Sequence, residues 1–134
     1  MLKQLSIYAE NKKGALQIIT AALFEEGINI WGSVTNDSAE YGIIRMVVSD
    51  PVKASRKLTE KGYLCRLTDV IAVETEDKPG ALNTLLTALI ESNINVDYTY
   101  LSFNRDSSMP VMILHTEGTE EVESCLKSKG FVVC

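Results

Sequence analysis

The spacing of apolar positions along the chain changes in a fixed order. Residues 5–9 alternate between apolar and polar side chains, as a half-buried strand does. Apolar residues then recur three and four positions apart over 16–23, which predicts a helix. Residues 28–48 contain two more alternating segments and predict a hairpin. A weaker helical pattern over 52–58 and a short strand at 63–65 complete the succession.

The same succession returns in the second half of the chain. Residues 10–30 align without gaps on residues 76–96, and ten of these 21 pairs are identical, where chance would give about one. Residues 58–63 match residues 126–131, with two additional residues in the hairpin of the second copy. The second copy is predicted to contain strands at 71–75, 94–98, 111–115 and 131–133 and helices at 82–89 and 122–126.

The order βαββαβ predicts an α+β fold of the ferredoxin-like type, in which an antiparallel four-stranded sheet carries both helices on one face. We expect two such domains in tandem, at residues 1–67 and 68–134. Each is small enough to be only marginally stable alone, and the connection at residues 66–69 is short. The two domains are therefore expected to pack side by side, and uncovered sheet edges favour a homodimer.

Local signals mark the ends of the first helix in each copy. Pro79 suits the first position of a helix. Gly27 and Asn93 are residue types that adopt the left-handed conformation that commonly ends a helix. The first helix of the second copy is therefore expected to extend from Pro79 to just before Asn93.

Composition and charge exclude several classes of function. The net charge of −5 provides no field that would attract nucleic acid. No apolar segment approaches the ~20 residues that span a bilayer, and the first residues lack the apolar core of a signal peptide. We therefore expect a cytoplasmic protein that binds neither nucleic acid nor membrane.

Cysteine and histidine usage argues against a metal centre or a cofactor. The three cysteines form no CxxC pair and are odd in number, which is typical of reduced thiols. His115 is the only histidine, so no Cys/His zinc cluster can form. We expect no metal and no cofactor, and we expect His115, Cys65 and Cys134 to have structural roles.

The turn from the first strand into the first helix of each copy is a candidate binding loop. Gly14 and Gly80 allow another group to approach closely, and the free backbone N–H groups of the helix form a site for a carboxylate. Asn11 or Asp77 could accept a hydrogen bond from an ammonium group. Alternatively, these two side chains simply cap their helices. The chemistry of the residues leaves both interpretations open.

Asn29 and Asn95 open the second strand of each copy. They begin the strand at the far end of the helix from the glycine, so a neighbouring domain would have to bring them to the same ligand. They could equally satisfy local backbone groups. Trp31, which stands where the second copy has Asp97, could line a ligand pocket, anchor a dimer interface or pack on the sheet.

The residues 76–82, EDKPGAL, followed by Leu89 and the step Ile94, Asn95 and Val96, resemble the ACT regulatory domain. The resemblance covers nearly the whole chain as two copies, and the first copy departs from it with Lys13 in place of the proline. It implies domains that pair side by side and bind amino acids at their interface.

The resemblance also implies which positions contact the ligand. The polar residue two before Pro-Gly contacts the amino group, the backbone around the glycine meets the carboxylate, and the asparagine contacts ligand across the interface. Carried over by position, the expected ligand-binding residues are Asn11, Lys13, Gly14, Ala15, Asn29, Ile30, Asp77, Pro79, Gly80, Ala81, Asn95 and Val96.

The sequence therefore favours a non-enzymatic regulatory or sensor protein made of two ACT-like domains. Its expected partner is a free amino acid or a similar small metabolite, whose binding would be communicated to another protein. Two alternatives remain: an assembly module without ligand, and a small ferredoxin-like enzyme. A single histidine and the lack of a convergent catalytic set speak against the enzyme.

Overall fold

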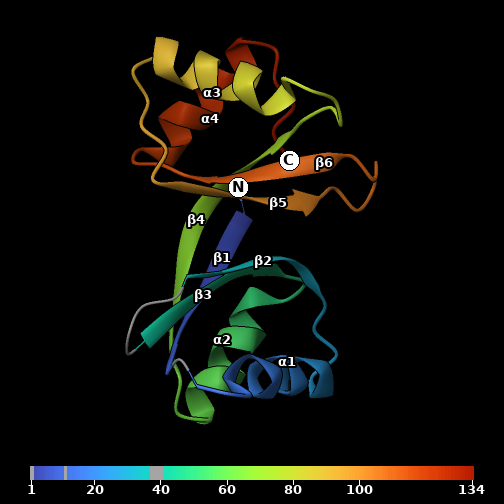
Figure 1. Cartoon of the computed structure of the whole chain (residues 1–134), viewed down its shortest axis with the longest axis vertical. Helices are drawn as coiled ribbons and strands as arrows, with labels where there is room; N and C mark the ends of the chain where they lie inside the picture. The colour runs from blue at the N-terminus through green and yellow to red at the C-terminus, as the bar shows by residue number, and fades with distance from the viewer. Residues whose placement is uncertain (1, 11, 37–40) are drawn as a thin grey trace. The chain divides into compact units, whose positions relative to one another are not determined.

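The computed structural model of the chain describes residues 2–10, 12–36 and 41–134. Two compact units are present (Figure 1): Lys3–Thr68, termed the N-terminal unit, and Asp69–Cys134 with Leu2, termed the C-terminal unit. The elements follow the order β1 (Leu2–Glu10), α1 (Ala15–Glu25), β2 (Ile30–Asn36), β3 (Tyr41–Val48), α2 (Pro51–Glu60), β4 (Leu64–Glu74), α3 (Ala81–Glu91), β5 (Tyr98–Phe103), β6 (Pro110–His115) and α4 (Thr119–Ser128).

The N-terminal unit is a sheet of order β2-β3-β1-β4 with α1 and α2 on one face (Figure 1). Strand β3 pairs antiparallel with both β1 and β2, and Leu5 lies opposite Met46. The alternating apolar residues of β1 and the apolar face of α1 belong to one buried cluster. The largest fully buried side chains of this core are Leu5, Ile7, Ile19, Leu23, Met46 and Leu58.

The C-terminal unit repeats this plan with the strand order β4-β6-β5 and with α3 and α4 on one face. Strand β6 pairs antiparallel with β4 and β5, and Ile71 lies opposite Leu114, at the positions equivalent to Leu5 and Met46. The fully buried side chains of this core are Ile71, Val73, Leu85, Leu89, Leu114 and Leu126. The predicted α+β, ferredoxin-like fold is therefore confirmed.

The predicted C-terminal ends of α1 and α3 are correct. Gly27 and Asn93 adopt positive φ angles of 68° and 58°. The N–H group of the next residue then turns back to the helix: Ile28 N donates to Leu23 O at 3.0 Å. Because this hydrogen bond keeps residue 28 at the helix end, β2 begins only at Ile30, two residues later than predicted.

The predicted position of Pro79 is wrong. Helix α3 begins at Ala81, and Gly80 occupies the N-cap in the left-handed conformation, with φ 88°. The left-handed residue lies between the proline and the helix, so Pro79 belongs to the loop. A proline at the first helical position needs helical backbone on its C-terminal side, and Gly80 does not provide it.

Three further strand predictions differ from the structure. The strand predicted at 94–98 is displaced toward the C-terminus, because β5 spans Tyr98–Phe103. Residues 66–69, expected to connect the two domains, lie inside the continuous strand β4, because Leu64–Glu74 contains no glycine or proline that would interrupt an extended backbone. The strand predicted at 131–133 is reduced to one bridge between Val133 and Val73. Hydrogen bonds from Glu74 N to Val132 O and from Cys134 N to Ala72 O flank this bridge.

Within the described residues, no helix has the length and apolar character needed to cross a membrane.

Candidate functional site

The loop between the first strand and the first helix has the same hydrogen bonds in both units. In the C-terminal unit, Lys78 N donates to Glu76 O at 3.0 Å, Ala81 N to Lys78 O at 3.3 Å, and Thr84 N to Gly80 O at 2.9 Å. The equivalent bonds of the N-terminal unit are Lys12 to Glu10 at 3.0 Å, Ala15 to Lys12 at 3.2 Å and Ile18 to Gly14 at 3.0 Å. The duplication has therefore preserved the backbone of the loop, and not only its residue types.

A left-handed glycine ends each loop. Gly14 and Gly80 are the N-cap residues of α1 and α3, with φ angles of 83° and 88°, and neither helix has a side-chain cap. Asp77 therefore does not cap α3, although it lies three residues before the N-cap, and it is exposed. The capping interpretation fails for Asp77, while Asn11 lies outside the described residues.

A cleft opens beside this loop in the C-terminal unit. Its volume is about 350 Å3, and its walls come from the end of β4, the loop, the first turn of α3, the end of the β5–β6 hairpin and the segment after α4. The lining residues are Glu74, Thr75, Glu76, Lys78, Ala81, Thr84, Met109, Gly130, Phe131 and Val132.

The N-terminal unit has a cleft of about 290 Å3 at the equivalent place. Its lining residues are Tyr8, Ala9, Glu10, Lys12, Ala15, Ile18, Gly62 and Tyr63. Each of these residues has a repeat counterpart in the lining of the C-terminal cleft. Tyr8, for example, corresponds to Glu74, and Tyr63 corresponds to Phe131. The clefts are thus two copies of one feature.

The loop lysines are held by neighbouring glutamates. Lys78 Nζ lies 2.5 Å from Glu76 Oε2, and Lys12 Nζ lies 3.6 Å from Glu10 Oε2. All four side chains are more than half exposed, so each pair contributes at most about 1 kcal/mol to stability. The charges of these pairs largely cancel at the mouths of the clefts.

Among the predicted ligand-binding residues that the structure describes, only two line these clefts. Ala15 and Ala81 do so as the first residues of α1 and α3. The remaining predicted loop residues are exposed and lie outside the cleft linings, namely Lys13, Gly14, Asp77, Pro79 and Gly80.

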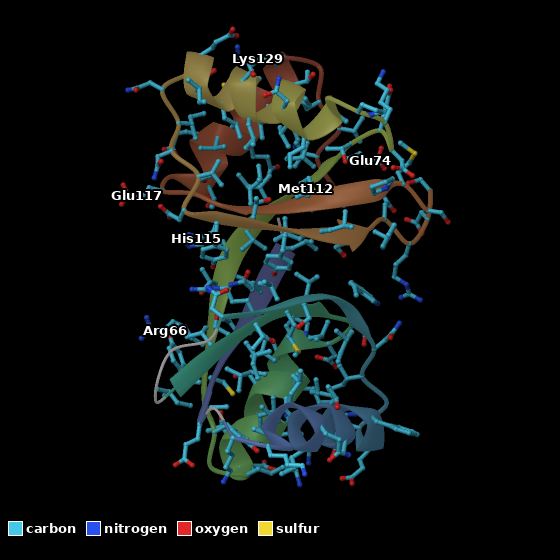
Figure 2. The ribbon with its side chains drawn as sticks, viewed as in Figure 1. Arg66, Glu74, Met112, His115, Glu117 and Lys129 are labelled. Carbon is cyan, nitrogen blue, oxygen red and sulfur yellow. The ribbon has the colours of Figure 1, made fainter. Side chains whose placement is uncertain are left out.

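Asn95 lies at the other end of α3 from the loop. The 11 residues of α3 make a helix about 16 Å long, so Asn95 and Gly80 of one unit cannot contact the same small ligand. Asn95 lines a separate pocket of about 330 Å3, and its Nδ2 donates to Asp97 Oδ1 at 3.4 Å. Figure 2 shows Glu74 and His115 at opposite ends of the sheet of the C-terminal unit.

The other residues predicted at the second strands make contacts within their own units. Asn29 uses its backbone, because its N–H group donates to Ser49 Oγ at 2.9 Å and its carbonyl oxygen accepts from Ser49 N at 2.9 Å. Ile30 and Val96 are half-buried and pack against the cores of their units. These hydrogen bonds belong to the main chain of Asn29, so the role predicted for its side chain stays a prediction.

Sequence reasoning missed the residues that close the clefts from the far side. Glu74, Met109 and Phe131 line the C-terminal cleft but come from three distant segments. One signal was present: the Gly-aromatic steps at residues 62–63 and 130–131 recur in the two copies. Their recurrence indicated a shared structural role, without indicating that they face the loop.

Two of the three cysteines, Cys65 and Cys134, have a raised pKa, which is the opposite of activation as nucleophiles. Burial raises the pKa of Cys65, against a lowering hydrogen bond from Thr59. Burial also raises the pKa of Cys134, with a further contribution from the negative charge of Glu74. Among the described residues, no group of three or more metal-binding side chains comes together.

Comparison with known proteins identifies the family. The model of the ACT domain pair matches residues 1–132. The crystal structure of protein BT0572 from Bacteroides thetaiotaomicron has a TM-score of 0.90 at 31% sequence identity, over 99% of this chain and 91% of that chain. No curated protein matches the sequence.

More distant structures share the fold. The ligand-free regulatory subunit of aspartate kinase from Thermus thermophilus has a TM-score of 0.65 at 13% identity, over 95% of this chain and 91% of that chain. Aspartate kinase from Clostridium acetobutylicum has a TM-score of 0.58 at 15% identity, over 95% of this chain and 32% of that chain. With a family match over nearly the whole length, the chain belongs to the ACT domain family, as an ACT domain pair.

Proposed function

We propose that this ACT domain pair is a non-enzymatic regulatory protein that binds a free amino acid or a similar small metabolite beside its strand-to-helix loops. One observation carries the proposal: the same cleft is built at equivalent positions of both units, with the same loop hydrogen bonds. Volumes of about 290 and 350 Å3 are at the small end of the range for ligand sites, which suits a single amino acid.

The loop offers groups of both signs to a zwitterion. The carboxylate of the ligand would meet backbone N–H groups in the first turn of α3, where the helix dipole favours an anion. The ammonium group would donate to Asp77, whose exposed carboxylate lies on the loop outside the cleft lining and does not cap the helix. In the N-terminal unit, the repeat places Asn11 in this role.

Asn95 and Asn29 would contribute from another subunit. Because α3 separates Asn95 from the loop of its own unit, a neighbouring domain would have to supply it, and we propose that this domain belongs to a second copy of the chain. A homodimer is therefore part of the proposal. The cytoplasm is its proposed location, and residues 1–67 and 68–134 are the proposed domains.

Binding would regulate by selecting a conformation. A ligand that binds one arrangement of subunits more tightly shifts the population toward it by its differential affinity. The output would then pass to a partner protein that recognises that arrangement.

A thermal-shift screen of the full chain against the twenty amino acids tests this function. A ligand at about 100 times its Kd adds roughly 2.7 kcal/mol to stability, which raises the Tm measurably. The shift should be lost in Asp77→Ala and kept in Glu120→Ala, a matched exposed carboxylate on α4. The absence of a shift with every amino acid would contradict amino-acid binding and favour an assembly module or a metabolite outside the amino acids.

A further inference from the structure

The two clefts differ most clearly where the first strand of each copy ends. The C-terminal cleft has Glu74 at this position, and the N-terminal cleft has Tyr8. Glu74 Oε1 accepts two hydrogen bonds, from Asn104 Nδ2 at 2.8 Å and from Ser107 Oγ at 3.0 Å. Both donors belong to the hairpin that has two additional residues in the second copy. The insertion thus brings donors to a carboxylate that the first copy lacks.

Glu74 is held in place by its backbone as well as by its side chain. Its N–H group donates to Val132 O at 2.9 Å. Asn104, in turn, is oriented by Asp106 N, which donates to Asn104 Oδ1 at 2.9 Å. The Asn104 amide therefore presents its NH2 group to Glu74. The carboxylate is fixed at the wall of the cleft before any ligand arrives, which reduces the entropy cost of binding.

The donors to Glu74 are neutral, so they orient the carboxylate without cancelling its charge. Among the described residues that line this cleft, Lys78 has the only cationic side chain, and it is paired with Glu76 at 2.5 Å. Burial raises the pKa of the Cys134 thiol, and the negative charge of Glu74 raises it further. The C-terminal cleft is therefore net negative, whereas Glu10 and Lys12 balance each other in the N-terminal cleft.

Apolar side chains share the wall with this carboxylate. Met109, Phe131 and Val132 line the same cleft as Glu74. An apolar surface that ends in a fixed negative charge is complementary to an alkyl chain that ends in a cation. Resting on the proposed function, we propose that the C-terminal cleft selects amino acids with a cationic alkyl side chain, and that Glu74 determines this specificity.

Calorimetric titration of the full chain with L-lysine and with L-norleucine tests the proposal, because the two ligands differ only in the terminal ammonium group. A hydrogen bond to a charged group increases affinity about ten- to a hundredfold. Wild-type protein should bind lysine tighter than norleucine by this factor. Glu74→Gln should reduce the ratio to about one, and Glu120→Gln, an exposed carboxylate on α4, should leave it unchanged.

The outcomes separate this inference from the function on which it rests. Equal affinity for lysine and norleucine in the wild type, or a ratio that survives in Glu74→Gln, overturns the specificity while amino-acid binding stands. If neither these two ligands nor any of the twenty amino acids binds, amino-acid binding is overturned, and the specificity proposed here with it.

A second variant keeps the proposal testable if Glu74→Gln does not fold. The double variant Asn104→Ala, Ser107→Ala retains the carboxylate but removes both groups that orient it. It should lower affinity for lysine several-fold, by about the value of one to two hydrogen bonds, and leave affinity for norleucine unchanged. Equal loss for both ligands would show that the hairpin serves the fold alone, and would overturn the role of Glu74.

Discussion

His115 Nδ1 lies 2.9 Å from Asp97 Oδ2, and the ring of Tyr98 stacks on the imidazole with the two centroids 4.9 Å apart. Asp97 also accepts the hydrogen bond from Asn95 at 3.4 Å. The first copy has Trp31 at the position equivalent to Asp97. The polar network beside the Asn95 pocket therefore belongs to the second copy alone, as does the carboxylate of Glu74 in the cleft.

Asp97→Asn should lower the free energy of unfolding by about 0.5–1 kcal/mol. The substitution keeps the shape of the side chain but removes its charge from the partly exposed pair with His115. Urea denaturation measures the change. Asp77→Asn, on an exposed loop, is the control and should change stability very little. Equal effects of the two substitutions would show that the pair with His115 is not stabilising.

Leu85→Ala should destabilise the protein by about 2–5 kcal/mol, the range for a large-to-small change at a closed site. Leu85 is fully buried in the core of the C-terminal unit, between α3 and its sheet. Leu82, on the same helix, is 39% exposed, so Leu82→Ala should cost less. Chemical denaturation compares the two variants, and a cost for Leu82→Ala that matches Leu85→Ala would contradict the assigned helix face.

Gly80→Ala and Gly14→Ala should each cost about 1–2 kcal/mol. Both glycines have positive φ, and a Cβ atom at either position would meet nothing within 4 Å. The cost therefore comes from backbone conformation and not from a clash. Thermal unfolding measures it, and similar losses at the two positions are expected because the loops share their hydrogen bonds. No loss at either glycine would contradict the left-handed N-caps.

Cys134 should become more reactive when Glu74 loses its charge. Burial and the Glu74 carboxylate both raise the pKa of this thiol, so the wild-type protein holds less of the reactive thiolate at a given pH near neutrality. Glu74→Gln removes one of the two causes, so the pKa should fall and alkylation by iodoacetamide should accelerate between pH 7 and 9.

Cys65 is the internal control for this experiment, because burial is the largest cause of its raised pKa and Glu74 is not among the causes. Mass spectrometry of the alkylated peptides gives the rate at each cysteine as a function of pH. An unchanged rate at Cys134, or an equal increase at both cysteines, would show that the charge of Glu74 does not act on Cys134.

The elements that depend on local pattern could be predicted from the sequence. The duplication, the helices, the left-handed residues Gly27 and Asn93 and the ferredoxin-like order all follow from short-range spacing and turn chemistry. The misplacement of Pro79 shows the limit of such rules. A proline predicts the start of a helix to within a turn, but the conformation of Gly80 decides the residue at which α3 begins.

The lining of the clefts could not be predicted, because it depends on contacts between distant segments. Phe131 and Met109 meet the loop only when the segment after α4 lies along β4 and the β5–β6 hairpin closes over the same edge. The bond between Asn104 and Glu74 joins residues 30 positions apart. No periodicity in the sequence indicates such a pair. The sequence therefore predicted the loop as a binding element, but not the residues that form the opposite wall of the cleft.

The most direct test of the central claim is a titration of 15N-labelled protein with the amino acid that gives the largest thermal shift, followed by amide chemical-shift perturbation. We expect the largest shifts in the clefts, at residues 74–84 and 130–132 of the C-terminal unit and, if both copies bind, at the equivalent residues 8–18 and 62–63. Shifts concentrated away from both clefts, or no shifts at saturating concentrations of any amino acid, would contradict the account.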